Sequence, residues 1–248
     1  IGPEIINEAL KVLKSVSSKI KQEFDFKFYD VGAVAIEKYQ NPLPENTWKG
    51  CKESDAILFG AIGHPKFDNN PKLKIRPEQG LLKLRKELGL FANLRPVKSY
   101  KEILSLSPIK QEIIDGVDML IIRELTGGLY FGDKKTNNNI STDICTYSVS
   151  EIERVTNVAI EYAKKRRNKI TLIDKANVLE TSRLWRKTVQ DISVKHPEIE
   201  LDYMFVDNAA MQIILNPKQF DVILTENLFG DIISCLLYTS DAADELSC

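Results

Sequence analysis

Apolar residues follow two different spacings in the first part of the chain, and each spacing predicts a different element. An interval of three or four residues is the period of a helix that packs by one face. It predicts an amphipathic helix over residues 4–22, with apolar positions at Ile5, Ala9, Leu13, Val16 and Ile20. An interval of two residues, the period of a strand, follows at Phe24, Phe26 and Phe28.

Helical and strand-like segments continue to alternate after residue 30. A second helix is predicted over Ala33–Tyr39, and the short apolar run Ala56–Phe59 predicts a buried strand before a glycine loop. Ser150 and Glu153 have the spacing of a capping box, so a helix is expected to begin there and to end near Lys165. Such alternation predicts a layered α/β architecture with a largely parallel sheet.

Four apolar runs in the rest of the chain end in polar residues. They are Val117–Ile122 before Arg123 and Tyr130, Ile170–Ile173 before Lys175 and Asn177, Leu201–Val206 before Asp207, and Asp221–Thr225 before Asp231. Each run has the length and composition of a buried strand. Because open α/β sheets bind ligands where their strands end, these polar residues are candidates for a binding site.

Residues 78–95 combine arginine with leucine in a way that suits a small organic acid. Arg85 follows the pair Leu81-Leu82 by about one helical turn, and Arg95 ends the segment. Arginine binds carboxylates through two parallel hydrogen bonds, and leucines on the same helical face would accommodate a branched alkyl group. The alternative is a surface helix with its leucines in the core and its arginines in solvent.

Composition and charge narrow the function classes. The chain has 248 residues, 43% of them hydrophobic and 28% charged, with a net charge of −1, as in soluble globular proteins. This charge gives no reason to expect binding to nucleic acid or membranes. No run approaches the roughly 18 apolar residues of a membrane span. The four cysteines lack metal-binding spacing and fit a reducing cytoplasm; they are Cys51, Cys145, Cys235 and Cys248.

These segments resemble the isocitrate/isopropylmalate dehydrogenase family of metal-dependent β-decarboxylating dehydrogenases. The opening Ile1-Gly2-Pro3-Glu4-Ile5, the loop Gly60–Lys66 and the four strand-end clusters are all similar to family motifs and occur in family order. Within the family, the chain most resembles the members that act on 3-isopropylmalate in leucine biosynthesis. The resemblance covers residues 1–234 and stops abruptly after Ser234.

The resemblance implies a two-domain isopropylmalate/isocitrate dehydrogenase-like α/β fold, not a classical Rossmann fold, and incomplete at both ends. Residues 1–95 would form part of a cofactor and substrate domain, and residues 96–234 a second domain that carries the interface of a homodimer. Residues 235–248 depart from the family and are expected to be a non-native tail. A further metal-ligating aspartate of the family would fall at Cys235, whose soft thiolate suits Mg²⁺ poorly.

The implied activity is the oxidative decarboxylation of 3-isopropylmalate to 4-methyl-2-oxopentanoate with reduction of NAD. This chemistry needs a base for the hydroxyl proton, a divalent cation as an electron sink and an acid that protonates the enolate. No Gly-x-Gly-x-x-Gly follows a strand, so NAD is implied by the resemblance alone.

The resemblance also assigns roles position by position. Carboxylate binding falls to Arg85, Arg95 and Arg123, and the isopropyl contact to Leu81 and Leu82. The base is Lys175, the acid is Tyr130, the ligands of substrate and of Mg²⁺ or Mn²⁺ are Asp207 and Asp231, and the nicotinamide ribose lies near Glu78 and Asn177. Lys175 and Asp207 would reach the site from the partner subunit of the dimer.

Several alternatives stay open at this point. Sister enzymes for isocitrate, homoisocitrate or tartrate share these charged residues, although the apolar pair Leu81-Leu82 would leave a third carboxylate unpaired. The chain as given could instead be an inactive fragment or a dimerisation module. Residue by residue, Tyr130 could close a core, Lys175 could lie at the surface, and Asp207 and Asp231 could cap helices. Arg123 could pair with Glu124 or with another carboxylate at the surface.

Overall fold

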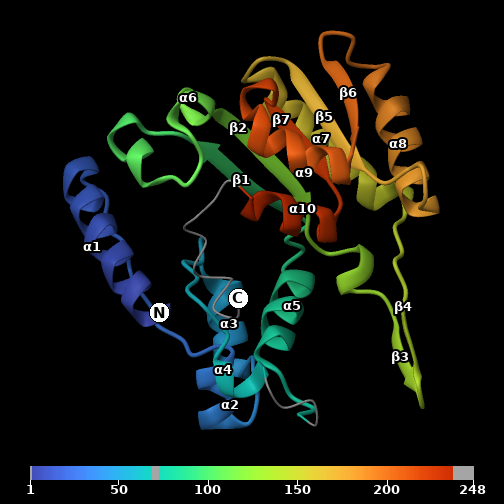
Figure 1. Cartoon of the computed structure of the whole chain (residues 1–248). Helices are drawn as coiled ribbons and strands as arrows, with labels where there is room; N and C mark the ends of the chain where they lie inside the picture. The colour runs from blue at the N-terminus through green and yellow to red at the C-terminus, as the bar shows by residue number, and fades with distance from the viewer. Residues whose placement is uncertain (1, 69–72, 237–248) are drawn as a thin grey trace. The chain divides into compact units, whose positions relative to one another are not determined.

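The computed structural model of the chain describes residues 2–68 and 73–236, which form two compact units (Figure 1). Unit 1 comprises the described residues up to Leu88, and unit 2 those from Gly89 onward. Strand β1 (Ala92–Lys98) lies wholly in unit 2, whereas the domain boundary implied by the resemblance falls inside this strand, at residue 95. None of the described helices combines the length and the apolar character that a membrane span requires.

Unit 1 is built from helices. They are α1 (Gly2–Ile20), α2 (Ala33–Tyr39), α3 (Glu45–Glu53), α4 (Pro65–Asp68) and α5 (Pro77–Glu87). The helices predicted over residues 4–22 and 33–39 are confirmed as α1 and α2. A small cluster of Ala33, Ile36 and Phe67 is buried in this unit and packs against Leu73.

The two strands predicted in unit 1 are wrong. Residues 24–28 and 56–59 adopt no regular secondary structure, and no strand occurs among the described residues of this unit. A strand is stabilised by backbone hydrogen bonds to a neighbouring strand, and these apolar segments have no such neighbour there. The segments are not buried either: Phe28 is 69% exposed and Leu58 is 49% exposed.

Unit 2 is organised by a five-stranded sheet in the order β1-β2-β7-β5-β6 (Figure 1). Its strands are β1, β2 (Asp118–Glu124), β5 (Lys169–Asp174), β6 (Glu200–Phe205) and β7 (Val222–Thr225). β1 pairs antiparallel with β2, and the other neighbouring strands are parallel. The four strands predicted from apolar runs and the largely parallel sheet are therefore confirmed.

Helices cover both faces of this sheet. Successive residues of a strand point to opposite faces, so neighbouring residues of one strand belong to different cores. Ile122 and Leu172 lie in one core, with residues of α7 and α8, whereas Ile121 and Ile173 lie in a second core, with residues of α9 and α10. The helices of unit 2 are η1 (Lys101–Leu106), α6 (Gln111–Ile114), η2 (Gly128–Tyr130), α7 (Val149–Lys164), α8 (Glu180–Ser193), α9 (Val206–Leu215), η3 (Pro217–Gln219) and α10 (Asn227–Cys235).

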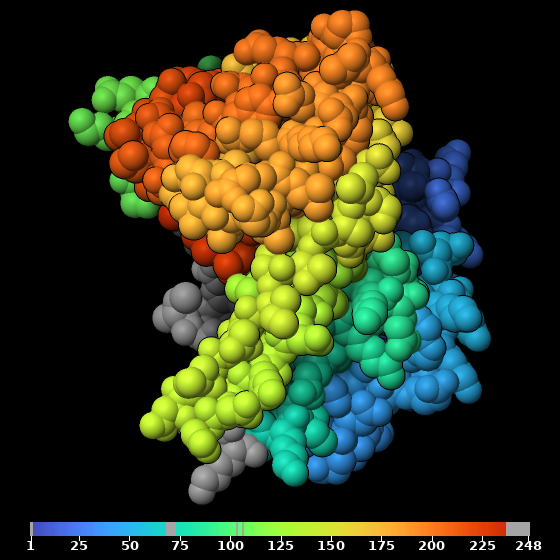
Figure 2. All heavy atoms as spheres, turned by 90° about the vertical axis from the view of Figure 1, so that its right-hand side faces the viewer, coloured from blue at the N-terminus to red at the C-terminus, as the bar shows by residue number. Residues whose placement is uncertain are grey.

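A separate two-stranded hairpin belongs to unit 2. It consists of β3 (Lys134–Asn137) and β4 (Ile140–Asp143), which pair antiparallel. All eight of these strand residues are exposed, and Figure 2 shows the yellow-green hairpin projecting from the sheet-bearing part of its unit. An exposed hairpin with both faces in solvent buries no core of its own. It can therefore be stabilised only by the surfaces that it contacts.

Helix α7 is confirmed, but its capping box lies two residues earlier than predicted. Ser148 accepts a hydrogen bond from the Glu151 N–H, and the Glu151 carboxylate accepts one from the Ser148 N–H. Ser150 and Glu153 have the same spacing, but both lie inside the helix. Spacing alone cannot choose between two overlapping boxes; the extended backbone at Ser148, typical of an N-cap, makes the choice.

Candidate active site

The register of β1 against β2 brings three polar side chains to one face of the sheet. Asn93 lies directly opposite Arg123, and Arg95 follows two residues later on β1. Residues that are paired across an antiparallel ladder, or that lie two apart in one strand, share a face. The same face carries α10, which contributes Asn227 and, about one turn later, Asp231.

Asp231 is the residue on which this cluster converges. Its Oδ1 accepts a hydrogen bond from Arg123 Nη1 at 2.5 Å and lies 3.5 Å from Arg95 Nη2. Its Oδ2 accepts a hydrogen bond from Tyr130 Oη at 2.6 Å. The structure thus brings together two of the predicted arginines, the predicted acid and one predicted aspartate, from β1, β2, η2 and α10.

Arg123 is buried, with 2% of its surface exposed. Its Nε and Nη2 donate to Asn227 Oδ1 at 3.1 and 2.7 Å, in addition to the bond from Nη1 to Asp231. Burying a guanidinium is costly unless its N–H groups are paired. Within the described residues, one N–H on each terminal nitrogen is left for a further acceptor, the pattern that a bound carboxylate would complete.

Tyr130 is held in its protonated form. Burial, together with the hydrogen bond to the Asp231 carboxylate, raises the pKa of Tyr130 to about 12, although the nearby Arg123 acts in the opposite direction. The phenol therefore carries its proton at neutral pH. A protonated hydroxyl next to the carboxylate-binding Arg123 is suited to proton donation to a carbon or oxygen of a bound acid.

Lys175 and Asp207 form a second charged pair in unit 2. Parallel strands β5 and β6 end side by side, with Asp174 in register with Phe205. The residues that follow, Lys175 and the first-turn Asp207 of α9, therefore lie close, and Lys175 Nζ donates to Asp207 Oδ1 at 2.6 Å. This hydrogen bond is the main cause of a lowered pKa at Asp207.

Neither Asp207 nor Asp231 is a helix N-cap, and Arg123 does not pair with Glu124. Asp207 lies in the first turn of α9, whose N-cap is Phe205, and Asp231 lies well inside α10, whose N-cap is Glu226. The Glu124 carboxylate instead accepts hydrogen bonds from the N–H groups of Thr126 and Gly127, which shape the loop after β2.

The remaining predicted residues divide between the two units. Glu78, Leu81, Leu82 and Arg85 all lie on α5 of unit 1; Glu78 is exposed and the other three are half-buried. Asn177 lies in unit 2 and is exposed in the turn after β5. The contacts described above lie within unit 2, in the Asp231 cluster and the Lys175–Asp207 pair.

A divalent cation would find only part of a donor set among the residues that the structure describes. Among the described residues, no three histidine, cysteine, aspartate or glutamate side chains gather as a metal site would require. Asp231 is a hard oxygen donor, but Cys235 one turn later presents a thiol, whose Sγ lies 3.1 Å from the Asp231 carbonyl oxygen. Mg²⁺ takes oxygen ligands, so these two side chains by themselves do not fit it.

Sequence reasoning missed four residues around the cluster. Asn93 and Asn227 bind the two arginines, Ser234 Oγ accepts a hydrogen bond from Arg95 Nη1 at 2.6 Å, and Glu226 is buried next to Asn227. Burial, and then the neighbouring Asp174 and Glu124, raise the pKa of Glu226 to about 7. The one sequence signal for Asn93 is its place two residues before Arg95 in a strand-like segment.

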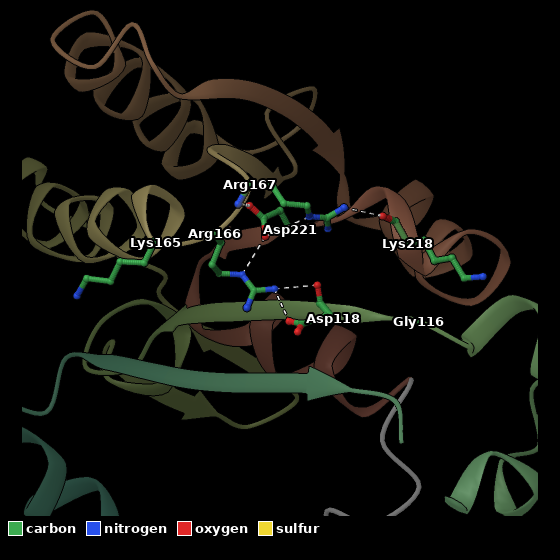
Figure 3. Close-up of a pocket in the computed structure, with 7 residues that line it drawn as sticks. All are labelled: Gly116, Asp118, Lys165, Arg166, Arg167, Lys218 and Asp221. Atoms are coloured by element: carbon green, nitrogen blue, oxygen red, sulfur yellow. Dashed lines mark hydrogen bonds and ion pairs between the residues drawn. The ribbon is translucent and has the colours of Figure 1, made fainter. Parts of the chain in front are cut away.

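A surface pocket of about 400 Å³ lies at the opposite, amino-terminal ends of β2, β5 and β7 (Figure 3). Arg166 Nε donates to Asp221 Oδ1 at 2.9 Å, and its Nη2 donates to Asp118 Oδ1 at 2.5 Å. Arg167 binds the backbone carbonyl of Phe220. These bonds tie the end of α7 to two strands, so the charges of this pocket serve the packing of unit 2.

Comparison with known proteins places these features in one family. A 3-isopropylmalate dehydrogenase of Bacteroides fragilis is 51% identical over 234 residues, which make up 94% of this chain and 66% of that protein. One of Carboxydothermus hydrogenoformans is 53% identical over 240 residues, which make up 94% of this chain and 64% of that protein. The chain thus spans slightly less than two thirds of the length of these curated relatives.

Solved structures agree with the sequence relatives. A crystal structure of isocitrate dehydrogenase from Methylococcus capsulatus matches with a TM-score of 0.81 at 30% identity, over 96% of this chain and 67% of that chain. A β-decarboxylating dehydrogenase from Thermococcus kodakarensis matches with a TM-score of 0.70 at 33% identity, over 95% of this chain and 64% of that chain. The predicted fold class is confirmed. Since the model of the family matches residues 1–240, the chain belongs to the isocitrate/isopropylmalate dehydrogenase family.

Proposed function

We propose that the protein oxidatively decarboxylates 3-isopropylmalate to 4-methyl-2-oxopentanoate with reduction of NAD, as a cytoplasmic step of leucine biosynthesis. Relatives at 51 and 53% identity carry the name of this enzyme. The observation that carries the proposal is the convergence of Arg95, Arg123 and Tyr130 on Asp231. It combines two carboxylate-binding groups with a protonated acid, which the substrate and the last chemical step both require.

The proposed roles follow from what each side chain can do. Arg95 and Arg123 bind the substrate carboxylates, with Arg85 of α5 as the third arginine. Tyr130 keeps its proton at neutral pH, because its pKa is raised to about 12, and donates it to the enolate carbon after carbon dioxide leaves. Lys175 helps to remove the hydroxyl proton, which requires its neutral amine; its contact with Asp207 keeps the side chain oriented before substrate arrives.

Leu81 and Leu82 are proposed to contact the isopropyl group, which selects this substrate over isocitrate. A third carboxylate against two leucines would lose its hydration without gaining a partner. The fold similarity to an isocitrate dehydrogenase does not argue against this assignment, because related folds carry different substrate pockets.

Metal and nucleotide are proposed as cofactors of the whole protein. When bound, Mg²⁺ or Mn²⁺ supplies an electron sink and NAD accepts a hydride. Asp231 is one proposed ligand, and Asp207 of a second copy is the other, because the described part of a single chain holds no group of three such ligands. Glu78 and Asn177 are proposed to lie near the nicotinamide ribose; both are exposed and therefore open to a ligand.

A homodimer is supported by apolar surface on unit 2. Three residues of α9 are well exposed: Met211 at 57%, Ile214 at 39% and Leu215 at 64%. On the hairpin, Ile140 is 72% exposed. Such side chains gathered on one helix are typical of a surface that another protein covers. A second copy placed there is the proposed source of the partner Lys175 and Asp207.

The decisive test is an assay of NADH formation with Mg²⁺, using both the 248-residue chain and the complete product of its gene. The complete product should use 3-isopropylmalate with at least about a hundredfold higher kcat/KM than isocitrate, homoisocitrate or tartrate. A preference for any of those three acids would refute the substrate assignment. Absence of NADH formation from all four by the complete, folded product would refute the dehydrogenase assignment itself.

A further inference from the structure

The two arginines of the Asp231 cluster share a feature that the proposed roles do not explain. Each donates its Nε–H to the side-chain oxygen of an asparagine: Arg123 to Asn227 at 3.1 Å, and Arg95 to Asn93 at 2.8 Å. The two asparagines come from different elements, α10 and β1. The same type of contact thus occurs at both arginines although the asparagines lie on different elements. This indicates that the arginines need a side-chain acceptor at Nε, and that the contact does not arise from the geometry of one helix or strand.

Asn227 is fixed in one orientation by bonds on every side. It is fully buried, its Nδ2 donates to the Gly127 carbonyl at 3.0 Å, and its backbone N–H donates to Tyr147 Oη at 3.0 Å. Because the Nδ2 end faces a carbonyl, the oxygen end must face the donors of Arg123. The amide therefore holds Nε and Nη2 of Arg123 and fixes the direction in which the remaining N–H groups of the guanidinium point.

Asn93 serves Arg95 through the geometry of the sheet. The two residues lie two apart on β1 and share a face, and Asn93 is also in register with Arg123 on β2. It therefore stands beside one arginine while it binds the other. Its oxygen accepts from Nε, which directs the terminal nitrogens of Arg95 toward Ser234 and Asp231.

The acceptors are neutral, and this determines the charge of the site. A carboxylate at either position would accept the same hydrogen bonds but would also cancel a positive charge. An amide accepts the hydrogen bond but adds no negative charge beside the guanidinium that it binds. In a poorly solvated site, a guanidinium that keeps its charge attracts a bound anion strongly.

We propose that Asn93 and Asn227 are positioning residues, which hold Arg95 and Arg123 in a carboxylate-binding geometry without neutralising them. This inference rests on the proposed function in one respect, that the anion is a substrate carboxylate. The hydrogen bonds themselves can be tested without any ligand, so the two ideas can fail separately.

The experiment uses the whole 248-residue chain with ¹⁵N-labelled arginine. Solvent exchange of the Nε–H protons is measured by NMR, and binding of 3-isopropylmalate by calorimetry. Three changes are compared: Asn227→Asp and Asn93→Asp, which keep the acceptor and add charge, and Asn227→Leu, which removes the acceptor at similar volume. Asn216→Asp, at an exposed position after α9, is the matched charge control.

If the inference holds, the slowest-exchanging Nε–H signal is lost in Asn227→Leu and kept in Asn227→Asp. Both aspartate variants should weaken 3-isopropylmalate binding by about tenfold or more, since each removes one net positive charge from a buried anion site. Asn216→Asp should bind within about twofold of wild type. A purely structural role predicts a different result at Asn93, whose described side-chain bond is an accepted one that aspartate keeps; Asn93→Asp would then bind as wild type does.

Two results would overturn the inference. One is unchanged Nε–H exchange in a folded Asn227→Leu; if that variant does not fold, Asn93→Leu gives the same reading at Arg95. The other is wild-type affinity in both aspartate variants. If Asn227→Leu loses Nε–H protection but the complete gene product binds no 3-isopropylmalate, positioning is supported and the substrate assignment is refuted.

Discussion

Units 1 and 2 contain apolar runs of the same kind, but only unit 2 turns them into strands. Residues 56–59 of unit 1 and Val222–Thr225 of unit 2 are both short apolar runs that end in a loop. The first stays unpaired, with Leu58 49% exposed, whereas the second lies between β2 and β5 with Leu224 fully buried. Strand formation therefore depends on the neighbours available, and the apolar pattern is only one of its conditions.

The same contrast separates the candidate functional residues. In unit 2, parallel strands end together and bring residues from distant parts of the sequence into contact, such as Arg123 and Asp231. In unit 1, Glu78, Leu81, Leu82 and Arg85 follow one another on a single helix, so their grouping needs no tertiary contact. Changes in unit 2 should therefore affect folding and binding together, and changes in unit 1 should affect mainly binding.

The largest effect is expected from Arg123→Met. It removes a buried guanidinium and leaves Asn227 and part of Asp231 without their donors, so the free energy of unfolding of unit 2 should fall by about 3 kcal/mol. Urea unfolding would be followed by Trp185, which is buried in unit 2, in a Trp48→Phe background. Lys83→Met, at an exposed position of α5, is the control and should leave the midpoint unchanged. Equal midpoints for both variants would contradict the difference between the units.

A core truncation should separate the two apolar runs. Leu224→Ala, at a fully buried position of β7, is expected to lower the free energy of unfolding by about 2–3 kcal/mol, because it leaves a cavity between packed layers. Leu58→Ala should cost far less, since half of that side chain is already in water. Thermal unfolding of both variants checks this, and a comparable loss from Leu58→Ala would show that the run in unit 1 is buried after all.

Leu82→Ser tests whether unit 1 selects the substrate without carrying the fold. The kcat/KM of the complete gene product for 3-isopropylmalate should fall by about tenfold, because an apolar contact of roughly one to two methylenes is lost. Thermal stability should change little, as Leu82 is only half-buried. Leu58→Ser, a matched change elsewhere in unit 1, should keep kcat/KM. Unchanged selectivity in Leu82→Ser would remove the physical reason for preferring isopropylmalate over isocitrate.

The smallest effect concerns pH and the buried Glu226 of unit 2. Its pKa is raised to about 7, first by burial, so the folded state binds a proton that the unfolded state releases near the ordinary value of 4.5. Its contribution to stability is therefore complete below the unfolded pKa and is lost as pH rises through about 7. Glu226→Gln should remove this dependence and gain roughly 1 kcal/mol at mildly alkaline pH.

The matched control for that change lies in unit 1. Glu78→Gln alters an exposed carboxylate on α5 and should leave the pH dependence of unfolding as it is in wild type. Unfolding curves at several pH values between the two pKa values would show the difference. A wild-type pH profile in Glu226→Gln would mean that this carboxylate ionises normally in spite of its burial.

Much of unit 2 could be predicted because its strands are continuous apolar runs. β2, β5, β6 and β7 were all expected, and so was their parallel arrangement, since each run is followed by a helix. The strands expected in unit 1 were wrong, since no described residue there pairs with them. The capping box of α7 was misplaced because Ser148 and Ser150 both begin an S-x-x-E sequence.

The sequence by itself determined which chemical groups the site can draw on: arginines for carboxylates, a tyrosine and a lysine for proton transfer, and aspartates as oxygen ligands. These assignments depend on residue type and order along the chain. The tertiary structure alone decided that Asn93 and Asn227 orient the arginines, that Asp231 joins Arg123 to Tyr130, and that Glu226 is buried. Hydrogen bonds between residues about 100 positions apart, and the loss of solvent that shifts a pKa, exist only after strand register and helix packing are set.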